Sequence, residues 1–204
     1  MKELLIQGAK EMHIALNDAQ ASALIHYLEL IIKWNKTYNL SAIRTMEVGV
    51  KKHLLDSLSI VPFIDQSPLL DVGSGAGLPG IVLSIMKPDL AVSVLDTVGK
   101  KCRFMQFVKS QLALKNLSVI NARVEAFNPQ QCFGQITSRA FAEVDKTLNL
   151  TQHLLCDNGH YLLMKGANAK QETPPKEAEI YQLSVPWVSD QRFLIKMKPL
   201  HKYE

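Results

Sequence analysis

The sequence predicts an α/β fold, in which a mainly parallel sheet of seven strands has helices on both faces and a helical N-terminal extension. Three observations support this prediction. Short apolar or β-branched runs alternate with helix-length segments between residues 69 and 165, which is typical of βαβ units. Two further β runs close the chain and predict an antiparallel hairpin at one edge of the sheet. The first third of the chain instead has apolar residues at helical spacing.

Capping residues and prolines delimit the elements of this first third. Asn17 and Asp18 precede a stretch with one apolar face, which predicts a helix that ends near Tyr38 and Asn39. A second helix is expected over residues 48–61, before Pro62. We therefore divide the chain into a helical N-terminal cap, residues 1–65, and an α/β domain, residues 66–204.

In the α/β domain, turn residues separate strands from helices. The predicted strands are 69–72, 91–96, 117–122, 134–138, 160–165, 180–185 and 192–197. Helices are expected over 81–86, 99–115 and 143–156, and residues 167–179 are expected to form a loop or a short helix.

Composition limits the protein to one globular domain with an appendage. The chain has 204 residues, of which 47% are hydrophobic and 21% charged, a balance that excludes disorder, collagen and a coiled coil. The net charge is +4, and all of the excess lies in residues 66–204, which carry 16 basic and 12 acidic residues. This mildly basic domain permits an anionic partner without requiring one.

The three cysteines, Cys102, Cys132 and Cys156, lie far apart and form no C-x-x-C pair. This pattern predicts neither a disulfide nor a zinc site, no other metal site is expected, and a reducing cytoplasm is the natural location. The N-terminus lacks the apolar core of a signal peptide, and no uncharged apolar stretch reaches the ~18 residues that span a bilayer. Neither secretion nor membrane insertion is therefore expected.

The strongest chemical signal is the segment DVGSGAGLPG at residues 71–80, between a predicted strand and a predicted helix. Glycines there permit positive φ angles and let a ligand approach the backbone closely. Asp96 ends the next strand, where its carboxylate can accept hydrogen bonds from both hydroxyls of a ribose. A tight turn and a helix-capping aspartate are the simpler explanation, but the spacing favours a nucleoside ligand.

Asp71, the first residue of this segment, helps to distinguish between two classes of nucleoside cofactor. Gly75, Gly77 and Gly80 match the dinucleotide pattern G-x-G-x-x-G, so a nicotinamide dehydrogenase is one distant alternative. Asp71 would repel a pyrophosphate, whereas it suits an ammonium group such as that of S-adenosylmethionine. Acid-x-Gly-x-Gly-x-Gly is the usual opening of class I methyltransferases, so we favour S-adenosylmethionine as the cofactor.

Several motifs, in this order and spacing, resemble one bacterial family over nearly the whole chain. They are 33–40 (KWNKTYNL), 53–57 (HLLDS), 71–80 (DVGSGAGLPG), 95–101 (LDTVGKK), 123–125 (RVE), 138–142 (SRAFA) and 163–166 (LMKG). The chain is similar to the RsmG family, also called GidB, whose members methylate guanine N7 in 16S ribosomal RNA. Thr97, where the family often has Ser, is the nearest departure. The resemblance implies a Rossmann-like class I methyltransferase sheet.

The resemblance also implies the residues that bind S-adenosylmethionine. Those implied to touch it are Gly73, Leu78, Val124, Glu125 and Arg139, with Gly75 and Gly77 in the same loop and Asp96 as the ribose-binding acid. The backbone of Val124 and Glu125 would then contact the adenine edge. For Glu125, a solvated helix-capping role is the alternative.

Arg139 is the predicted catalytic residue. It ends the fourth predicted strand at the mouth of the crevice, where a planar guanidinium can hold a carboxylate or phosphate, or stack on a base. Five basic residues are RNA-binding candidates, although a solvated surface role is the alternative for each: Arg123, Arg192, Lys100, Lys101 and Lys165. His53 and Asp56 lie three apart on a helix, and a structural hydrogen bond between them is expected.

Missing motifs narrow the chemistry. The Asn-Pro-Pro-Tyr motif of DNA amino-group methylation is replaced by Ser-Arg-Ala-Phe at 138–141, and no cysteine follows a proline as in cytosine-C5 enzymes. Guanine N7 has a free lone pair, so its methylation needs positioning rather than a general base. We expect a monomer acting on 16S RNA in the small ribosomal subunit or an assembly intermediate. A methyltransferase for small molecules or proteins, and a non-catalytic binding module, are the alternatives.

Overall fold

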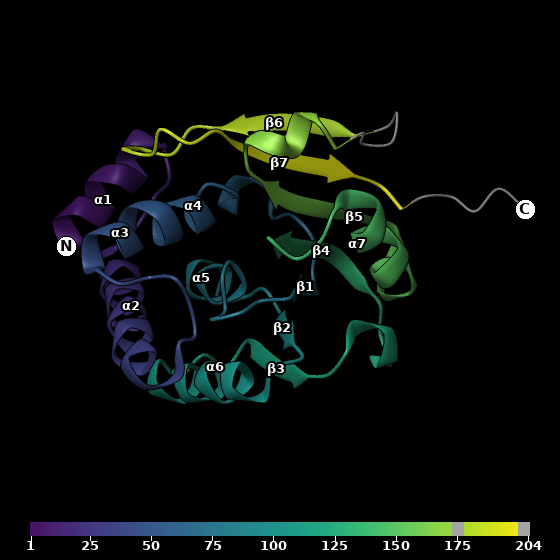
Figure 1. The fold of residues 1–204 in the computed structure, drawn as a ribbon, viewed down its shortest axis with the longest axis horizontal. Coiled ribbons are helices and arrows are strands. Elements are labelled where there is room, and N and C mark those ends of the chain that lie inside the picture. Colours follow the sequence, from purple (N-terminus) through teal and green to yellow (C-terminus); the bar gives the residue numbers. More distant parts are fainter. Residues whose placement is uncertain (173–177, 200–204) are drawn as a thin grey trace, which may run out of the picture.

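The computed structural model describes residues 1–172 and 178–199. It contains the predicted seven-stranded sheet, whose strand order is β3-β2-β1-β4-β5-β7-β6 (Figure 1). The strands are β1 (Leu69–Val72), β2 (Val92–Asp96), β3 (Leu117–Asn121), β4 (Phe133–Arg139), β5 (Leu155–Lys165), β6 (Glu179–Leu183) and β7 (Arg192–Met197). The α-helices are α1 (Lys2–Glu11), α2 (Asp18–Tyr38), α3 (Met46–Gly49), α4 (Leu55–Leu58), α5 (Gly80–Met86), α6 (Gly99–Gln111) and α7 (Val144–Thr151). Shorter helical turns are η1 (Val50–Leu54), η2 (Val61–Phe63), η3 (Val124–Ala126), η4 (Gln152–Leu154) and η5 (Ala167–Lys170).

Strands β1 to β5 run parallel, and β7 is antiparallel to both β5 and β6. The predicted closing hairpin is therefore confirmed. The chain winds outward from β1 in one direction through β2 and β3, and in the other through β4 and β5. Open α/β sheets bind their ligands at the carboxyl ends of the strands, where the strand order reverses. In this protein that point lies between β1 and β4.

Helix α2 begins and ends where its capping residues predict. The Asn17 side chain accepts a hydrogen bond from the Gln20 backbone, and the Gln20 side chain accepts one from the Asn17 backbone, so the two form a capping box. At the other end Asn39 adopts the left-handed conformation that terminates helices. The predicted second helix corresponds to α3, η1 and α4, which follow one another without a break from residue 46 to 58.

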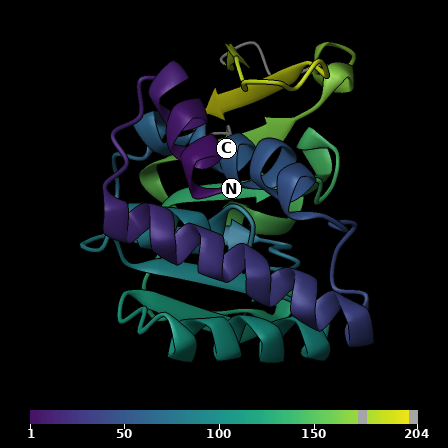
Figure 2. The ribbon, with the colours of Figure 1, turned by 90° about the vertical axis from the view of Figure 1, so that its left-hand side faces the viewer.

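Two apolar clusters fill the two faces of the sheet. The larger joins the N-terminal helices to α5 and α6, and Figure 2 shows α2 crossing in front of the sheet on this side. The smaller joins α7 to the opposite face, through Val144 and Leu148. Helices therefore cover both faces, as predicted. The domain boundary between residues 65 and 66 stays a prediction, although the N-terminal helices share the larger core with α5 and α6.

Three element ends differ from the sequence-based expectation. Helix α6 ends at Gln111, and Ala113 just beyond it has a left-handed φ of 50°. Strand β5 begins at Leu155, because Leu155 pairs with Phe133 before an irregularity leads to the pairing of His160 with Gln135. The helix expected over 143–156 is therefore shorter than predicted, since α7 ends at Thr151, and its predicted end was wrong. Residues 167–170 form the short helix η5, while residues 173–177 of the expected loop lie outside the described part of the chain.

The cysteine prediction was also wrong, because Cys132 and Cys156 form a disulfide across a sequence separation of 24. Cys132 directly precedes β4, and Cys156 is the second residue of β5. The pairing of Phe133 with Leu155 brings the neighbouring side chains of Cys132 and Cys156 together. No spacing motif in the sequence predicts this contact. The cysteine argument for a reducing compartment therefore no longer holds. Over the described residues, no helix is long and apolar enough to cross a membrane.

Candidate active site

Two cavities lie at the carboxyl ends of the parallel strands. The β2 cavity, about 390 Å³ in volume, is lined by Gly73, Asp96, Lys101, Val124, Glu125 and Lys146 among others. The β5 cavity, about 780 Å³, is lined by His53, Asp56, Arg139, Lys165, Glu172 and Arg192 among others. Ala140, Phe141 and Ala142 line both cavities. The segment that follows β4 is therefore a common wall between two potential binding sites.

The glycine loop forms the floor between β1 and α5. Gly73, Gly75 and Gly77 have φ values of 67°, 62° and 99°, which residues with a side chain rarely adopt. Backbone N–H groups of Gly73 and Ser74 donate to the Leu95 carbonyl, so the loop is fixed to the end of β2. A Cβ built at Gly75 has no neighbour within 4 Å, which leaves open space beside the loop.

Asp71 supports this loop from below. Its side chain is completely buried, lines neither cavity, and accepts a hydrogen bond from the Gly80 N–H over 2.8 Å. Burial raises the pKa of this carboxyl to about 7. The structure thus places Asp71 as a brace at the start of α5, and not on the cavity surface where the sequence suggested that it would face an ammonium group.

Asp96 lies at the end of β2 with its carboxylate on the β2 cavity. Oδ2 accepts a hydrogen bond from the Gly75 N–H over 2.9 Å, and Oδ1 accepts one from the Val98 N–H over 2.8 Å. The Lys101 ammonium lies 3.7 Å from Oδ2. These contacts fix the carboxylate in one orientation next to the open space at Gly75.

The neighbouring side chains of Lys100 and Lys101 lie in different surroundings. Lys101 lines the β2 cavity and pairs with Asp96, whereas Lys100 lines neither cavity. Val124 and Glu125 form η3 on the far side of the β2 cavity, with Arg123 beside them. The structure therefore places Lys101 and Arg123 with the residues that the resemblance assigns to the cofactor.

Leu78, a further residue that the resemblance implies in cofactor binding, is buried in the larger apolar cluster and lines neither cavity. Gly77 is similarly enclosed, since a Cβ there would lie 2.3 Å from Ile81 Cδ1. In this structure both residues pack against the apolar core beneath the glycine loop and face neither of the two cavities. Their predicted contact with the cofactor stays a prediction.

A buried ion-pair cluster forms one side of the β5 cavity. Arg139, at the end of β4, places Nη1 3.1 Å from Oδ2 of Asp56. Arg192, at the start of β7, places Nε 3.2 Å from Oδ1 of the same carboxylate. Asp56 comes from α4 and is 5% exposed. One carboxylate of the N-terminal helices thus holds two arginines of the sheet.

The expected hydrogen bond between His53 and Asp56 does not form. His53 belongs to the π-helical turn η1, whose wider spacing misaligns residues three apart, and the two arginines occupy Asp56 instead. The His53 Nδ1 is buried and has no hydrogen-bond partner among residues 1–172 and 178–199. Burial, then the charges of Arg139, Arg192 and Lys52, lower the pKa of His53 to about 4, so its imidazole is neutral at pH 7.

Lys165, at the end of β5, binds the backbone of the common wall. Its ammonium donates to the Ala142 carbonyl over 2.6 Å and pairs with Glu172 over 2.8 Å. Glu172 in turn accepts a hydrogen bond from the Val144 N–H at the start of α7. The structure therefore uses Lys165 to hold the segment between β4 and α7, with only 10% of its side chain exposed.

A protein-family model described as rRNA small subunit methyltransferase G matches residues 20–194. The chain belongs to this family. The Ribosomal RNA small subunit methyltransferase G of Ruthia magnifica subsp. Calyptogena magnifica is 65% identical over 192 residues, which cover 94% of this chain and 95% of that protein. The protein of the same name from Hydrogenovibrio crunogenus is 45% identical over 196 residues, which cover 94% and 91%. The predicted family resemblance is confirmed.

Solved structures confirm the class I methyltransferase fold. A SAM dependent methyltransferase from Aquifex aeolicus aligns with a TM-score of 0.57 at 14% identity, covering 75% of this chain and 93% of that one. The ribosomal protein L11 methylase from Lactobacillus delbrueckii subsp. bulgaricus aligns with a TM-score of 0.56 at 12% identity, covering 76% and 80%. At these identities the likeness shows the fold alone.

In this member of the methyltransferase G family, three site features had escaped sequence reasoning. Asp56 is the acid between two arginines, Phe141 lies in the common wall, and Tyr27 donates a hydrogen bond to Ala76 of the glycine loop. Each depends on contacts between distant segments. The local signals for them were the HLLDS motif at residues 53–57, which contains Asp56, and the SRAFA motif at 138–142, which contains Phe141.

Proposed function

We propose that the chain transfers a methyl group from S-adenosylmethionine to guanine N7 of 16S ribosomal RNA. Membership of the small-subunit methyltransferase G family supports the reaction and the substrate class. The observation that carries the proposal is the arrangement of two cavities on either side of residues 140–142, with Arg139 at the start of that wall. One cavity suits the cofactor and the other suits the acceptor.

The β2 cavity fits S-adenosylmethionine in size and chemistry. Its volume, about 390 Å³, lies in the range of small-molecule sites. Asp96 would accept the ribose hydroxyls, the backbone at Val124 and Glu125 would contact adenine, and the open space at Gly75 admits the ligand beside the loop. Gly73 and Gly77 keep that loop in its left-handed conformation. When bound, the cofactor supplies an electrophilic methyl group on a sulfonium.

The β5 cavity fits an unpaired nucleotide. Its volume is about 780 Å³, and its lining balances four basic with four acidic side chains. Arg139 keeps most of its N–H donors unpaired over the described residues, so it can donate to the oxygen and nitrogen acceptors of a base or a phosphate. Guanine N7 already carries a lone pair, so the residues around it need to position it and not to deprotonate it. The neutral His53 is consistent with a site that works by positioning. Arg139 lines the β5 cavity and not the β2 cavity, next to the shared wall that begins at Ala140, so its predicted contact with the cofactor stays a prediction.

The substrate that we propose is 16S RNA within the small ribosomal subunit or an assembly intermediate, in the cytoplasm, with the enzyme acting as a monomer. The net charge of +4 predicts modest, salt-sensitive affinity for RNA. Arg123, which lines the β2 cavity, and Lys100, which lines neither cavity, are both exposed and remain candidates for phosphate contacts. Arg192 and Lys165 are already paired within the protein.

Replacing Arg139 tests the assigned role. Arg139→Ala is expected to lower the rate of methyl transfer by about 100-fold, since it removes the guanidinium that lines the β5 cavity beside the wall shared with the β2 cavity. The matched control is Arg44→Ala, because Arg44 is exposed and lines neither cavity. Both proteins should remain folded by circular dichroism. A wild-type rate for Arg139→Ala would remove Arg139 from the reaction.

A further inference from the structure

The ion-pair cluster of Asp56, Arg139 and Arg192 links three parts of the chain that are far apart in sequence. Asp56 belongs to α4, Arg139 ends β4 and Arg192 begins β7. Oδ2 of Asp56 accepts a hydrogen bond from Arg139 over 3.1 Å, whereas Oδ1 forms an ion pair with Nε of Arg192 at 3.2 Å and accepts no hydrogen bond from the described residues. The two guanidinium groups therefore lie close together on the surface of the β5 cavity.

The two arginines differ in how completely they are used. Arg192 also places Nη2 3.5 Å from Asp190 and donates from Nη1 to the Gln191 carbonyl, so all three of its nitrogens have partners. Over the described residues, Asp56 is the sole hydrogen-bond or ion-pair partner of Arg139. A guanidinium has five N–H donors, and Arg139 thus keeps most of its donors for a ligand.

A long, mobile side chain loses rotational freedom when it binds a ligand, and this loss weakens binding. The entropic cost is smaller when another group of the protein already holds the side chain in place. Asp56 holds Arg139, and Arg192 holds Asp56 from the other side through its own contacts with Asp190 and Gln191. This chain of contacts orients the Arg139 guanidinium before any substrate arrives.

We propose that Asp56 is a positioning residue for methyl transfer: anchored by Arg192, it holds Arg139 at the junction of the two cavities, with its remaining donors free for the acceptor nucleotide. The inference rests on the proposed function. It assigns a role in the reaction to the N-terminal helices, since α4 supplies the acid.

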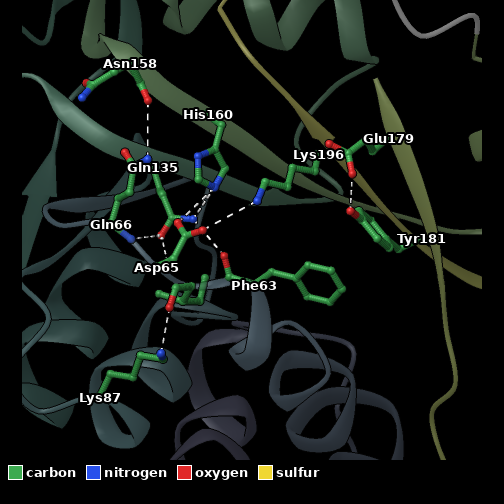
Figure 3. A network of polar contacts seen from close by, with 11 residues as sticks. Phe63, Asp65, Gln66, Lys87, Gln135, Asn158, His160, Glu179, Tyr181 and Lys196 are labelled. Carbon is green, nitrogen blue, oxygen red and sulfur yellow. Dashed lines mark hydrogen bonds and ion pairs between the residues drawn. The ribbon is translucent and has the colours of Figure 1, made fainter. Parts of the chain in front are cut away.

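Asp65 offers a matched control at the opposite end of the sheet. Like Asp56, it is an acid of the N-terminal segment that faces two side chains of the sheet, His160 at 3.4 Å and Lys196 at 3.6 Å, although 54% of its side chain is exposed (Figure 3). It lines neither of the two cavities. A purely structural role for Asp56 predicts that Asp56→Asn lowers the Tm and leaves kcat of the folded protein unchanged, whereas positioning predicts a loss of kcat. Asp65→Asn controls for the removal of an ion-paired acid away from the two cavities.

The test uses the full chain, radiolabelled S-adenosylmethionine and small ribosomal subunits that lack the methyl group. Asp56→Asn is expected to lower kcat by about 100-fold, the loss that misplacement of a reacting group produces, and to change the Kd for S-adenosylmethionine by less than about twofold. Asp65→Asn should retain the wild-type kcat. Asp56→Glu keeps the charge and should give a rate between those of wild type and Asp56→Asn.

A double variant separates positioning from a general effect. If Asp56 acts through Arg139, Asp56→Asn adds less than about twofold to the loss already caused by Arg139→Gln. If Asp56→Asn alone does not fold, Asp56→Asn combined with Arg192→Gln removes one charge of each sign. That protein should be clearly slower than Arg192→Gln alone.

Three results would overturn the inference while leaving the proposed function intact. They are a wild-type rate for Asp56→Asn, a full multiplicative loss in the Arg139→Gln background, and equal rates for Arg192→Gln with and without Asp56→Asn. Absence of label in RNA with the wild-type protein would instead overturn the proposed function, and the inference with it.

Discussion

The hydroxyl of Tyr27 donates a hydrogen bond to the carbonyl of Ala76 over 2.7 Å, which ties helix α2 to the glycine loop. Tyr27 is fully buried, and 49 residues separate it from Ala76. The N-terminal helices thus support the loop beside the β2 cavity directly. They also supply Asp56 to the β5 cavity, so both cavities depend on them.

Tyr27→Phe removes only this hydroxyl and leaves the Ala76 carbonyl without its partner. We expect the free energy of unfolding to fall by about 1–3 kcal/mol, and binding of S-adenosylmethionine to weaken severalfold because the loop is less ordered. Tyr161→Phe is the control, since Tyr161 is also buried and accepts a hydrogen bond from Thr151 on the other face of the sheet. It should lower the Tm without changing the Kd; an unchanged Kd for Tyr27→Phe would contradict the account.

Gly75 and Gly77 have similar backbone conformations but different surroundings. Gly77→Ala places a methyl group 2.3 Å from Ile81 and 3.2 Å from Tyr27, whereas Gly75→Ala meets nothing within 4 Å. We expect Gly77→Ala to cost about 3 kcal/mol or more through overpacking and left-handed strain, and Gly75→Ala about 1–2 kcal/mol through strain alone.

Although Gly75→Ala is expected to cost less stability than Gly77→Ala, we expect it to weaken binding of S-adenosylmethionine strongly. Its alanine would project into the open space that we assign to the cofactor, so calorimetry should show at least a tenfold weaker Kd for S-adenosylmethionine at a temperature where the protein is folded. An unchanged Kd in Gly75→Ala would place the cofactor elsewhere.

The contribution of His53 and His160 to stability should fall as the pH is lowered below 6.5, because the folded protein resists protonation of both imidazoles, whereas the raised pKa of the buried Asp71 carboxyl acts in the opposite direction. The pKa of His53 is lowered to about 4, and burial also lowers the pKa of His160. At His160 the reason is visible in Figure 3: the Gln135 amide faces its Nε2 at 2.6 Å. The amide is held in this orientation because its Oε1 accepts hydrogen bonds from the Asp65 and Gln66 backbone.

The sign follows from the lowered pKa values. The unfolded chain takes up protons near pH 6.5 and the folded chain does not, so the stabilisation is present above 6.5 and is lost as the pH falls toward the folded pKa. For His53, discounted for partial exposure, we expect a loss on the order of 1–2 kcal/mol between pH 7 and 5 in urea titrations. His53→Gln should reduce this dependence, and exposed His26→Gln should not. An equal pH dependence of stability in the wild type and in His53→Gln would contradict the account, because the opposing proton uptake by Asp71 is the same in both proteins.

Reduction of the Cys132–Cys156 disulfide should lower stability without lowering activity. The bridge closes a segment with a sequence separation of 24, for which a loss of about 2–4 kcal/mol is typical. It lies at the amino ends of β4 and β5, roughly 20 Å along the strands from Arg139. Replacing both cysteines by serine should therefore lower the Tm and leave kcat unchanged. An equal Tm with and without reductant would show that the bridge does not form in solution.

Local signals explain why so much of the fold could be predicted. The capping residues of α2, the glycines between β1 and α5, and the β-branched run of β2 each determine a structure within a few residues. The position of Asp96 beside the loop followed from strand order alone. The overall sheet required only these elements and the rules of parallel connections.

The remaining features depend on how distant segments pack together. Cys132 meets Cys156 through the register of two strands, and Asp56 meets Arg139 across 83 residues because α4 packs against the end of the sheet. Lys101 was predicted on an RNA-facing surface but turns inward to Asp96. No periodicity or short motif contains this information.

The most direct test of the account is to incubate the protein with radiolabelled S-adenosylmethionine and small subunits from cells that lack this gene, then map N7-methylguanine by strand scission. The account predicts label in 16S RNA and one scission site that depends on the protein. Label in another nucleotide position or atom would contradict the assignment to guanine N7. Label only in a protein or small molecule, or cofactor binding with no transfer, would contradict the proposed function itself.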